Sequence, residues 1–102
     1  MDKYKVVWTE KALSDMSQCI SFVLSVSAEA ALELRNDFKK TADSLNVFPE
    51  RNPIFEMPKA FPYVVRKQIV KDRYILLYTV EKNDVFIYRV LDARRKFDQL
   101  LK

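Results

Sequence analysis

Residues 63–95 read YVVRKQIVKDRYILLYTVEKNDVFIYRVLDARR, which is three runs of β-branched and aromatic residues separated by two polar breaks. The breaks are Lys71-Asp72 and Asn83-Asp84. Asn and Asp tolerate positive φ and hydrogen-bond to their own backbone, so each break predicts a tight hairpin turn. Three strands joined by two hairpins form an antiparallel meander, and the remainder of the chain must cover one of its faces.

Side chains in these runs alternate between the two faces of the predicted sheet. In the middle run, one face takes Tyr74, Leu76, Tyr78 and Val80, and the other takes Arg73, Ile75, Leu77 and Thr79. Both sets contain large apolar residues, so this run is predicted to be the central strand. In the first run, one face takes Tyr63, Val65 and Ile69, and the other takes Val64, Arg66, Gln68 and Val70. We expect one face covered by helices and a more open face with arginines at its margins.

The first 46 residues predict one strand and two helices. Alternation predicts a strand over 4–8, and Thr9 is a suitable N-cap for a helix over 10–26. Ser27 is the N-cap of a second helix, which ends near Asn46, a residue that can adopt the left-handed conformation of a C-cap. Because almost no linker separates the helices, they are expected to pack as an antiparallel hairpin.

Two further segments complete the predicted architecture. Residues 47–62 contain four prolines and predict a stiff loop, and residues 94–101 (RRKFDQLL) suit a short terminal helix. The fold class is therefore α+β in the order β-α-α-β-β-β, with an antiparallel sheet, a helical hairpin on one face and a short C-terminal helix. The 102 residues suffice for one domain, residues 1–102.

The composition excludes several kinds of chemistry. The chain has no histidine, which excludes Ser-His and Cys-His nucleophile pairs, and no glycine, which excludes phosphate loops and dinucleotide fingerprints. Its single cysteine, Cys19, cannot build a thiolate metal site. We therefore expect no metal and no cofactor, and any chemistry must use Arg, Lys, Tyr, Asp or Glu.

Basic side chains are concentrated in the C-terminal part of the chain. The net charge is +4, but residues 59–102 carry eleven basic and five acidic side chains, a balance of +6.

No apolar run approaches the ~20 residues that span a bilayer, and the N-terminus has no signal-peptide core. A cytoplasmic location is expected.

Four strings resemble the toxins of the RelE/ParE superfamily of type II toxin–antitoxin modules. They are YKVVWTEKALSDM (4–16), SLNVFPERNP (44–53), VVRKQIVKDRYILLYTV (64–80) and DVFIYRVLDARRKFDQLL (84–101). Their order and spacing carry the resemblance across nearly the whole chain. It is closest to the ParE-like, plasmid-stabilisation branch, in which Arg-Tyr opens the central strand and Val-Leu-x-x-Arg-Arg closes the last one.

The resemblance implies a small basic toxin that a cognate antitoxin neutralises. RelE-like members cleave mRNA on the ribosome, whereas ParE-like members block DNA gyrase. Arg66 matches a basic position on the open sheet face of the RelE branch, and Arg94 or Arg95 matches the one after the last strand. Other basic positions of that branch hold Gln68 and Ile75 here, and Leu101 or a neighbour replaces its C-terminal tyrosine. Gyrase inhibition is therefore favoured.

Candidate site residues follow from both branches. A ribonuclease would use Arg66 and Arg95 as catalytic cations. The possible general bases are Lys67, Lys71, Glu50, Glu56 and the tyrosines, and the spacing of the residues singles out none of them. The binding candidates are Arg66, Lys67, Arg73, Arg94 and Arg95. The alternative interpretation of each arginine is a solvated charge at a sheet edge, and it is favoured for Arg73 and Arg89. An antitoxin segment, extended or helical, would cover a groove or sheet edge, and a non-toxic antitoxin-binding homologue is a third possibility.

Overall fold

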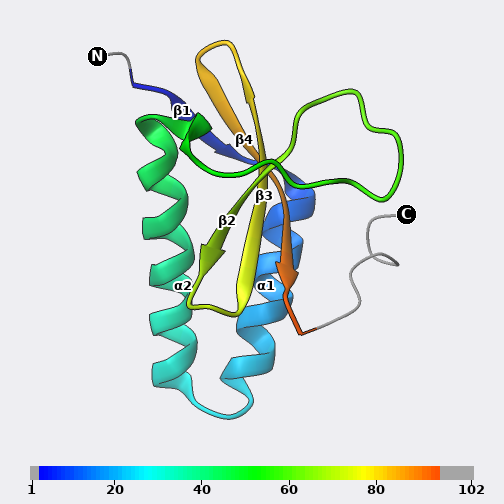
Figure 1. The fold of residues 1–102 in the computed structure, drawn as a ribbon. Coiled ribbons are helices and arrows are strands. Elements are labelled where there is room, and N and C mark those ends of the chain that lie inside the picture. The colour runs from blue at the N-terminus through cyan, green and yellow to red at the C-terminus, as the bar shows by residue number, and fades with distance from the viewer. Residues whose placement is uncertain (1–2, 95–102) are drawn as a thin grey trace.

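The structure is a computed structural model that describes residues 3–94 (Figure 1). Its regular elements follow the predicted order β-α-α-β-β-β. They are β1 (Lys5–Trp8), α1 (Glu10–Leu24), α2 (Ala28–Asp43), the 3-10 turns η1 (Ser44–Asn46) and η2 (Pro49–Arg51), β2 (Arg66–Val70), β3 (Tyr74–Glu81) and β4 (Asp84–Asp92). The predicted C-terminal helix over 94–101 lies outside the described residues. Neither described helix is long and apolar enough to cross a membrane.

The four strands form one mixed sheet in the order β1-β4-β3-β2. β2, β3 and β4 pair antiparallel as predicted, and β3 is a central strand as expected. β1 joins the sheet in parallel to β4, with Lys5 opposite Asp84 and Trp8 opposite Ile87. The parallel direction of β1 could not be predicted from the sequence, because alternation within residues 4–8 carries no information about strand direction. In the chain, the helical hairpin separates β1 from the meander.

Both helices begin at the predicted caps. The Thr9 hydroxyl accepts a hydrogen bond from the Ala12 N–H at 3.2 Å, and the Ser27 hydroxyl accepts one from the Ala30 N–H at 3.1 Å. α1 ends at Leu24, two residues earlier than predicted. The hairpin packs on one face of the sheet (Figure 1).

The chain leaves α2 differently from the prediction. The helix ends at Asp43 and tightens into η1, so Asn46 is not a left-handed C-cap. The Asn46 carbonyl accepts the N–H of Tyr4 at 2.8 Å, which ties this turn to the beginning of β1. The left-handed residue comes two positions later, at Phe48 with φ 48°.

The two hairpin turns agree with the sequence to within one residue. Lys71 and Asp72 both have positive φ, 54° and 57°, as the predicted turn requires. The second turn is one residue earlier than predicted, because Lys82 takes the positive φ of 55° and Asp84 already belongs to β4.

Each face of the sheet has its own apolar core. On the helix side, Tyr74, Leu76 and Tyr78 of β3 pack with residues of α2 such as Leu34 and Phe38. On the opposite face, a smaller cluster contains Val65, Ile75, Leu77 and Leu91, with Phe55, Met57 and Phe61 of the proline-rich loop packed against it. We call this second surface the loop-side face. It is the face that the sequence analysis expected to be open, and the loop partly covers it.

Candidate functional site

Arg66 and Lys67 lie on opposite faces of β2, so the structure does not bring these two cations together. Arg66 pairs with Tyr78 in the β-ladder, on the helix side, and its Nη1 donates to the Asn52 carbonyl at 2.7 Å. Lys67 pairs with Leu77, on the loop-side face. The expectation of Arg66 on the open face is therefore wrong. Arg66 has the same parity as Val70, which is buried in the helix-side core.

Arg73 and Arg94, in contrast, come together around Asp92. Arg73 Nη2 lies 3.2 Å from Asp92 Oδ2, and its guanidinium stands 5.0 Å from the ring centroid of Tyr74. The backbone N–H of Arg94 donates to Asp92 Oδ1 at 3.0 Å, and its Nε lies 3.7 Å from the same oxygen. These contacts gather both cations at one end of the sheet.

The predicted basic residues are thus divided between the middle and one end of β3. Arg66 is opposite Tyr78, in the middle of this strand, whereas Arg73 directly precedes its first residue, Tyr74. Five residue steps separate Arg73 from Tyr78, which corresponds to about 16 Å along the strand. Arg95 lies outside the described residues, so the predicted pairing of Arg66 with Arg95 stays a prediction.

Sequence reasoning missed the most buried ion pair of the described residues, Asp15 with Arg89. Arg89 Nε donates to Asp15 Oδ2 at 2.7 Å and its Nη2 to Oδ1 at 3.2 Å, and the side chains are only 13% and 8% exposed for Asp15 and Arg89. The Val90 N–H also donates to Asp15 Oδ2, at 3.0 Å. The partners are 74 residues apart in the chain, and no local spacing marks them.

A β-bulge explains how Asp15 reaches the strand. Leu77 pairs with Arg89 but Tyr78 pairs with Ile87, so Tyr88 is an extra residue in β4. A bulge interrupts the ladder and re-aims neighbouring side chains. Arg89 is thereby directed to α1, although its ladder partner Leu77 faces the loop side.

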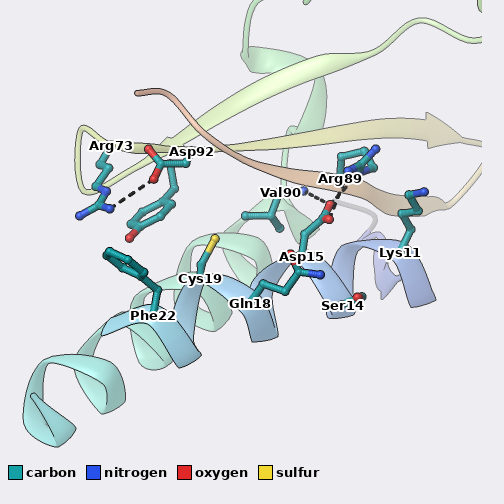
Figure 2. Close-up of a pocket in the computed structure, with 11 residues that line it drawn as sticks. Lys11, Ser14, Asp15, Gln18, Cys19, Phe22, Arg73, Arg89, Val90 and Asp92 are labelled. Atoms are coloured by element: carbon teal, nitrogen blue, oxygen red, sulfur yellow. Dashed lines mark hydrogen bonds and ion pairs between the residues drawn. The ribbon is translucent and has the colours of Figure 1, made fainter. Parts of the chain in front are cut away.

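These groups border a groove between α1 and the end of β4, with a volume of about 360 Å³ (Figure 2). We call it the α1–β4 groove. One wall is a stripe of α1 that runs from Lys11 through Asp15 and Cys19 to Phe22. The other wall comes from the sheet and consists of Arg73, Tyr74, Arg89, Val90 and Asp92.

The displaced pKa values all move away from neutrality. Burial raises the pKa of Tyr74, and it raises that of Tyr78 against the opposing hydrogen bond from Asn52. The hydrogen bond to Asp37 raises the pKa of Lys71. Burial alone would raise the pKa of Asp92, but the hydrogen bond from Arg94 and the guanidinium of Arg73 outweigh it and lower the net value.

The loop-side face presents no arginine from the described strands. The strands contain two arginines, Arg66 and Arg89, and both are directed to the helix side. By alternation, the cations of this face are Lys5 on β1 and Lys67 on β2, at opposite edges of the sheet. Within residues 3–94, no three His, Cys, Asp or Glu side chains are grouped so that they could hold a metal ion.

The model of a known family covers most of the chain. The ParE toxin of the type II toxin–antitoxin system parDE matches over residues 6–97. The chain belongs to this ParE toxin family. It is also 31% identical over 91 residues to "Toxin RelE2" of Caulobacter vibrioides, which covers 89% of this chain and 97% of that protein.

The fold of this ParE-family toxin agrees with a solved structure. The "Chromosomal ParDE TA system from P. aeruginosa" superposes with a TM-score of 0.71 at 19% identity, over 90% of this chain and 98% of that one. The family implies a cognate antitoxin as partner. Both ParE and RelE appear among the names of similar proteins, so the family does not distinguish a gyrase target from a ribosomal one.

Proposed function

We propose that this ParE-family toxin arrests growth by binding DNA gyrase through protein–protein contact, and that its antitoxin neutralises it. The observation that carries the proposal is the absence of arginine from the loop-side face of the described strands. The resemblance places the ribonuclease cations of the RelE branch on the corresponding face. Here the centre of the face is an apolar cluster, with a lysine at each edge of the sheet and a loop packed across part of it.

The chemistry of RNA cleavage supports the same choice. Attack by a 2′-hydroxyl needs cations that stabilise the developing phosphorane charge, and a group that transfers a proton with a pKa near the working pH. The pKa values of Tyr74 and Tyr78 are raised, so these tyrosines are poorer proton donors at neutral pH. Lys71 is held more firmly protonated and Asp92 more firmly ionised. None of these groups is tuned for general acid–base catalysis.

A ribosome-dependent endoribonuclease is the second candidate. The likeness to "Toxin RelE2" of Caulobacter vibrioides favours it, because 31% identity extends over nearly the whole of both chains. It would use Arg66 and Arg95 as the catalytic cations. In this case Arg66→Ala and Arg95→Ala abolish both growth arrest and mRNA cleavage.

The deciding experiment compares two targets with one preparation of the purified chain. DNA gyrase is assayed with relaxed plasmid and ATP, and mRNA integrity is followed in a reconstituted translation mixture. We expect supercoiling to be inhibited at a modest molar excess of the chain, and the mRNA to stay intact. Cleavage of the mRNA without inhibition of supercoiling would contradict gyrase inhibition and support the endoribonuclease. Unimpaired growth of bacteria that produce the soluble chain alone would indicate a non-toxic antitoxin-binding homologue.

A further inference from the structure

The turn that follows α2 holds an aromatic residue in a conformation that its own side chain disfavours. Phe48 has a φ of 48° and a ψ of 55°, which is the left-handed region, where the Cβ of an L-residue crowds the following carbonyl oxygen. The next residue is Pro49, and a proline favours extended conformations in the residue before it. Two steric effects therefore oppose this conformation. Asparagine would relieve the first of them, because it is among the residues that adopt the left-handed region most readily.

Packing within the chain does not offset this strain. The side chain of Phe48 is 63% exposed and belongs to neither apolar cluster of the described residues. Four residues of the described part of the chain have positive φ, and the other three are the polar residues Lys71, Asp72 and Lys82 of the hairpin turns. Strained backbone is concentrated at binding and switch sites, where the strained residue has a function.

Hydrogen bonds fix the backbone on both sides of Phe48. Arg51 Nη1 donates to the Val47 carbonyl at 2.7 Å, and the backbone N–H of Arg51 donates to the Phe48 carbonyl at 3.1 Å. On the other side, Pro49 is buried and its carbonyl accepts a hydrogen bond from the Tyr78 hydroxyl. The ring is thus presented on a rigid base, and a residue whose backbone is already in place loses less conformational freedom on binding.

The charges of this turn favour a protein over a nucleic acid as the partner of Phe48. Arg51 is the single basic residue from 43 to 52, and its guanidinium already donates to carbonyl groups of the same turn. Asp43 and Glu50 are exposed carboxylates of this segment. Nucleic acids are bound through cations that neutralise phosphates, so a phosphate backbone would be repelled here. An apolar pocket on a protein fits an exposed phenyl ring in this setting.

We infer that Phe48 inserts into an apolar pocket of DNA gyrase and is a hot spot of that contact, an inference that rests on the proposed function. Interface hot spots are typically aromatic side chains that fill a desolvated pocket of the partner. Because the ring is exposed in the free toxin, its removal and the relief of the strain should stabilise the fold while they weaken inhibition. Opposite effects on stability and activity are characteristic of residues kept for function, and a residue that serves the fold alone does not show them.

The test replaces Phe48 by asparagine and measures stability and inhibition on the same preparation. Phe48→Asn removes the ring and adopts the left-handed conformation more readily, so the urea midpoint is expected to rise by about 0.5 M. The concentration that half-inhibits plasmid supercoiling by gyrase is expected to rise about 30-fold or more, as the loss of an aromatic hot spot predicts.

Two further variants serve as controls. Phe48→Leu keeps a large apolar side chain and the strained backbone, and its half-inhibiting concentration is expected to stay within about fivefold of the unchanged chain. Leu32→Asn removes a side chain that is 57% exposed on α2, and it is expected to stay within about twofold.

Equal half-inhibiting concentrations for Phe48→Asn and the unchanged chain, or a lower urea midpoint for Phe48→Asn, would overturn the inference. If the unchanged chain does not inhibit supercoiling, the proposed function fails, and growth arrest then tests Phe48 separately. Phe48→Asn that still arrests growth would overturn the inference as well. Loss of growth arrest by a stable Phe48→Asn would support the role of the ring in binding the target and assign it to a protein other than gyrase.

Discussion

The α1–β4 groove and the loop-side face use the same sheet in opposite ways. The groove gathers ion pairs between α1 and the strand ends, and its arginines are held by Asp15 and Asp92. The loop-side face buries Ile75 and Leu77 beneath a proline-rich loop and presents no arginine from the described strands. The difference shows that the basic excess of the C-terminal half does not identify a basic surface. The surface depends on which face each strand residue takes and on which carboxylates accompany it.

The largest effect is expected from removing one partner of the most buried ion pair in the groove. Asp15→Ala leaves Arg89 without this carboxylate and the Val90 N–H without its acceptor. Removing one partner of a buried pair destabilises by about 3–5 kcal/mol. Equilibrium unfolding in urea measures the loss, with Asp15→Asn as a milder control that keeps one acceptor oxygen. A change below about 1 kcal/mol would mean that the pair is solvated, as surface pairs are.

A second test asks whether the apolar cluster of the loop-side face stabilises the protein as a buried core does. Leu77 is fully buried there, so Leu77→Ala is expected to cost about 2–5 kcal/mol of unfolding free energy. Val64→Ala is the matched control, because Val64 is 58% exposed and its truncation is expected to stay within about 0.5 kcal/mol. Equal urea midpoints for the two variants would show that the loop does not close over this face in solution.

The smallest effect concerns the charged end of the groove, where Asp92 makes the free energy of unfolding depend on pH. The folded-state pKa of Asp92 lies below the ordinary value of 3.8, so its ionised form is preferentially stabilised in the folded state. That contribution is fully present above the unfolded-state pKa and is lost as the pH falls through the folded-state pKa. Unfolding free energies measured from pH 5 down to pH 2 should therefore fall less steeply for Asp92→Asn than for the unchanged chain. Identical slopes would contradict the ion pairs with Arg73 and Arg94.

Local features of the fold were readable from the sequence. Thr9 and Ser27 were recognised as caps because an N-cap is a local hydrogen bond between a side chain and a backbone N–H three residues later. The Lys71-Asp72 turn and the central position of β3 follow from residue type and from alternation. Each of these signals extends over only a few neighbouring residues.

Features that join distant segments were not readable. The parallel pairing of β1 with β4 joins segments that lie far apart in the chain, and no local pattern marks the bulge at Tyr88. Alternation placed Arg66 on the same face as Val70, but it could not tell which face the helices cover, and the expectation of Arg66 on the open face failed for that reason.

The sequence by itself determined the order of the helices and strands, the N-caps of both helices and the faces of β2 and β3, because these follow from short-range sterics and hydrogen bonding. Only the tertiary structure decided which face the helices cover and which carboxylate meets which arginine. Asp15 and Arg89 are 74 residues apart, and they meet because packing and a single extra residue in β4 bring them together. The α1–β4 groove is a product of that meeting.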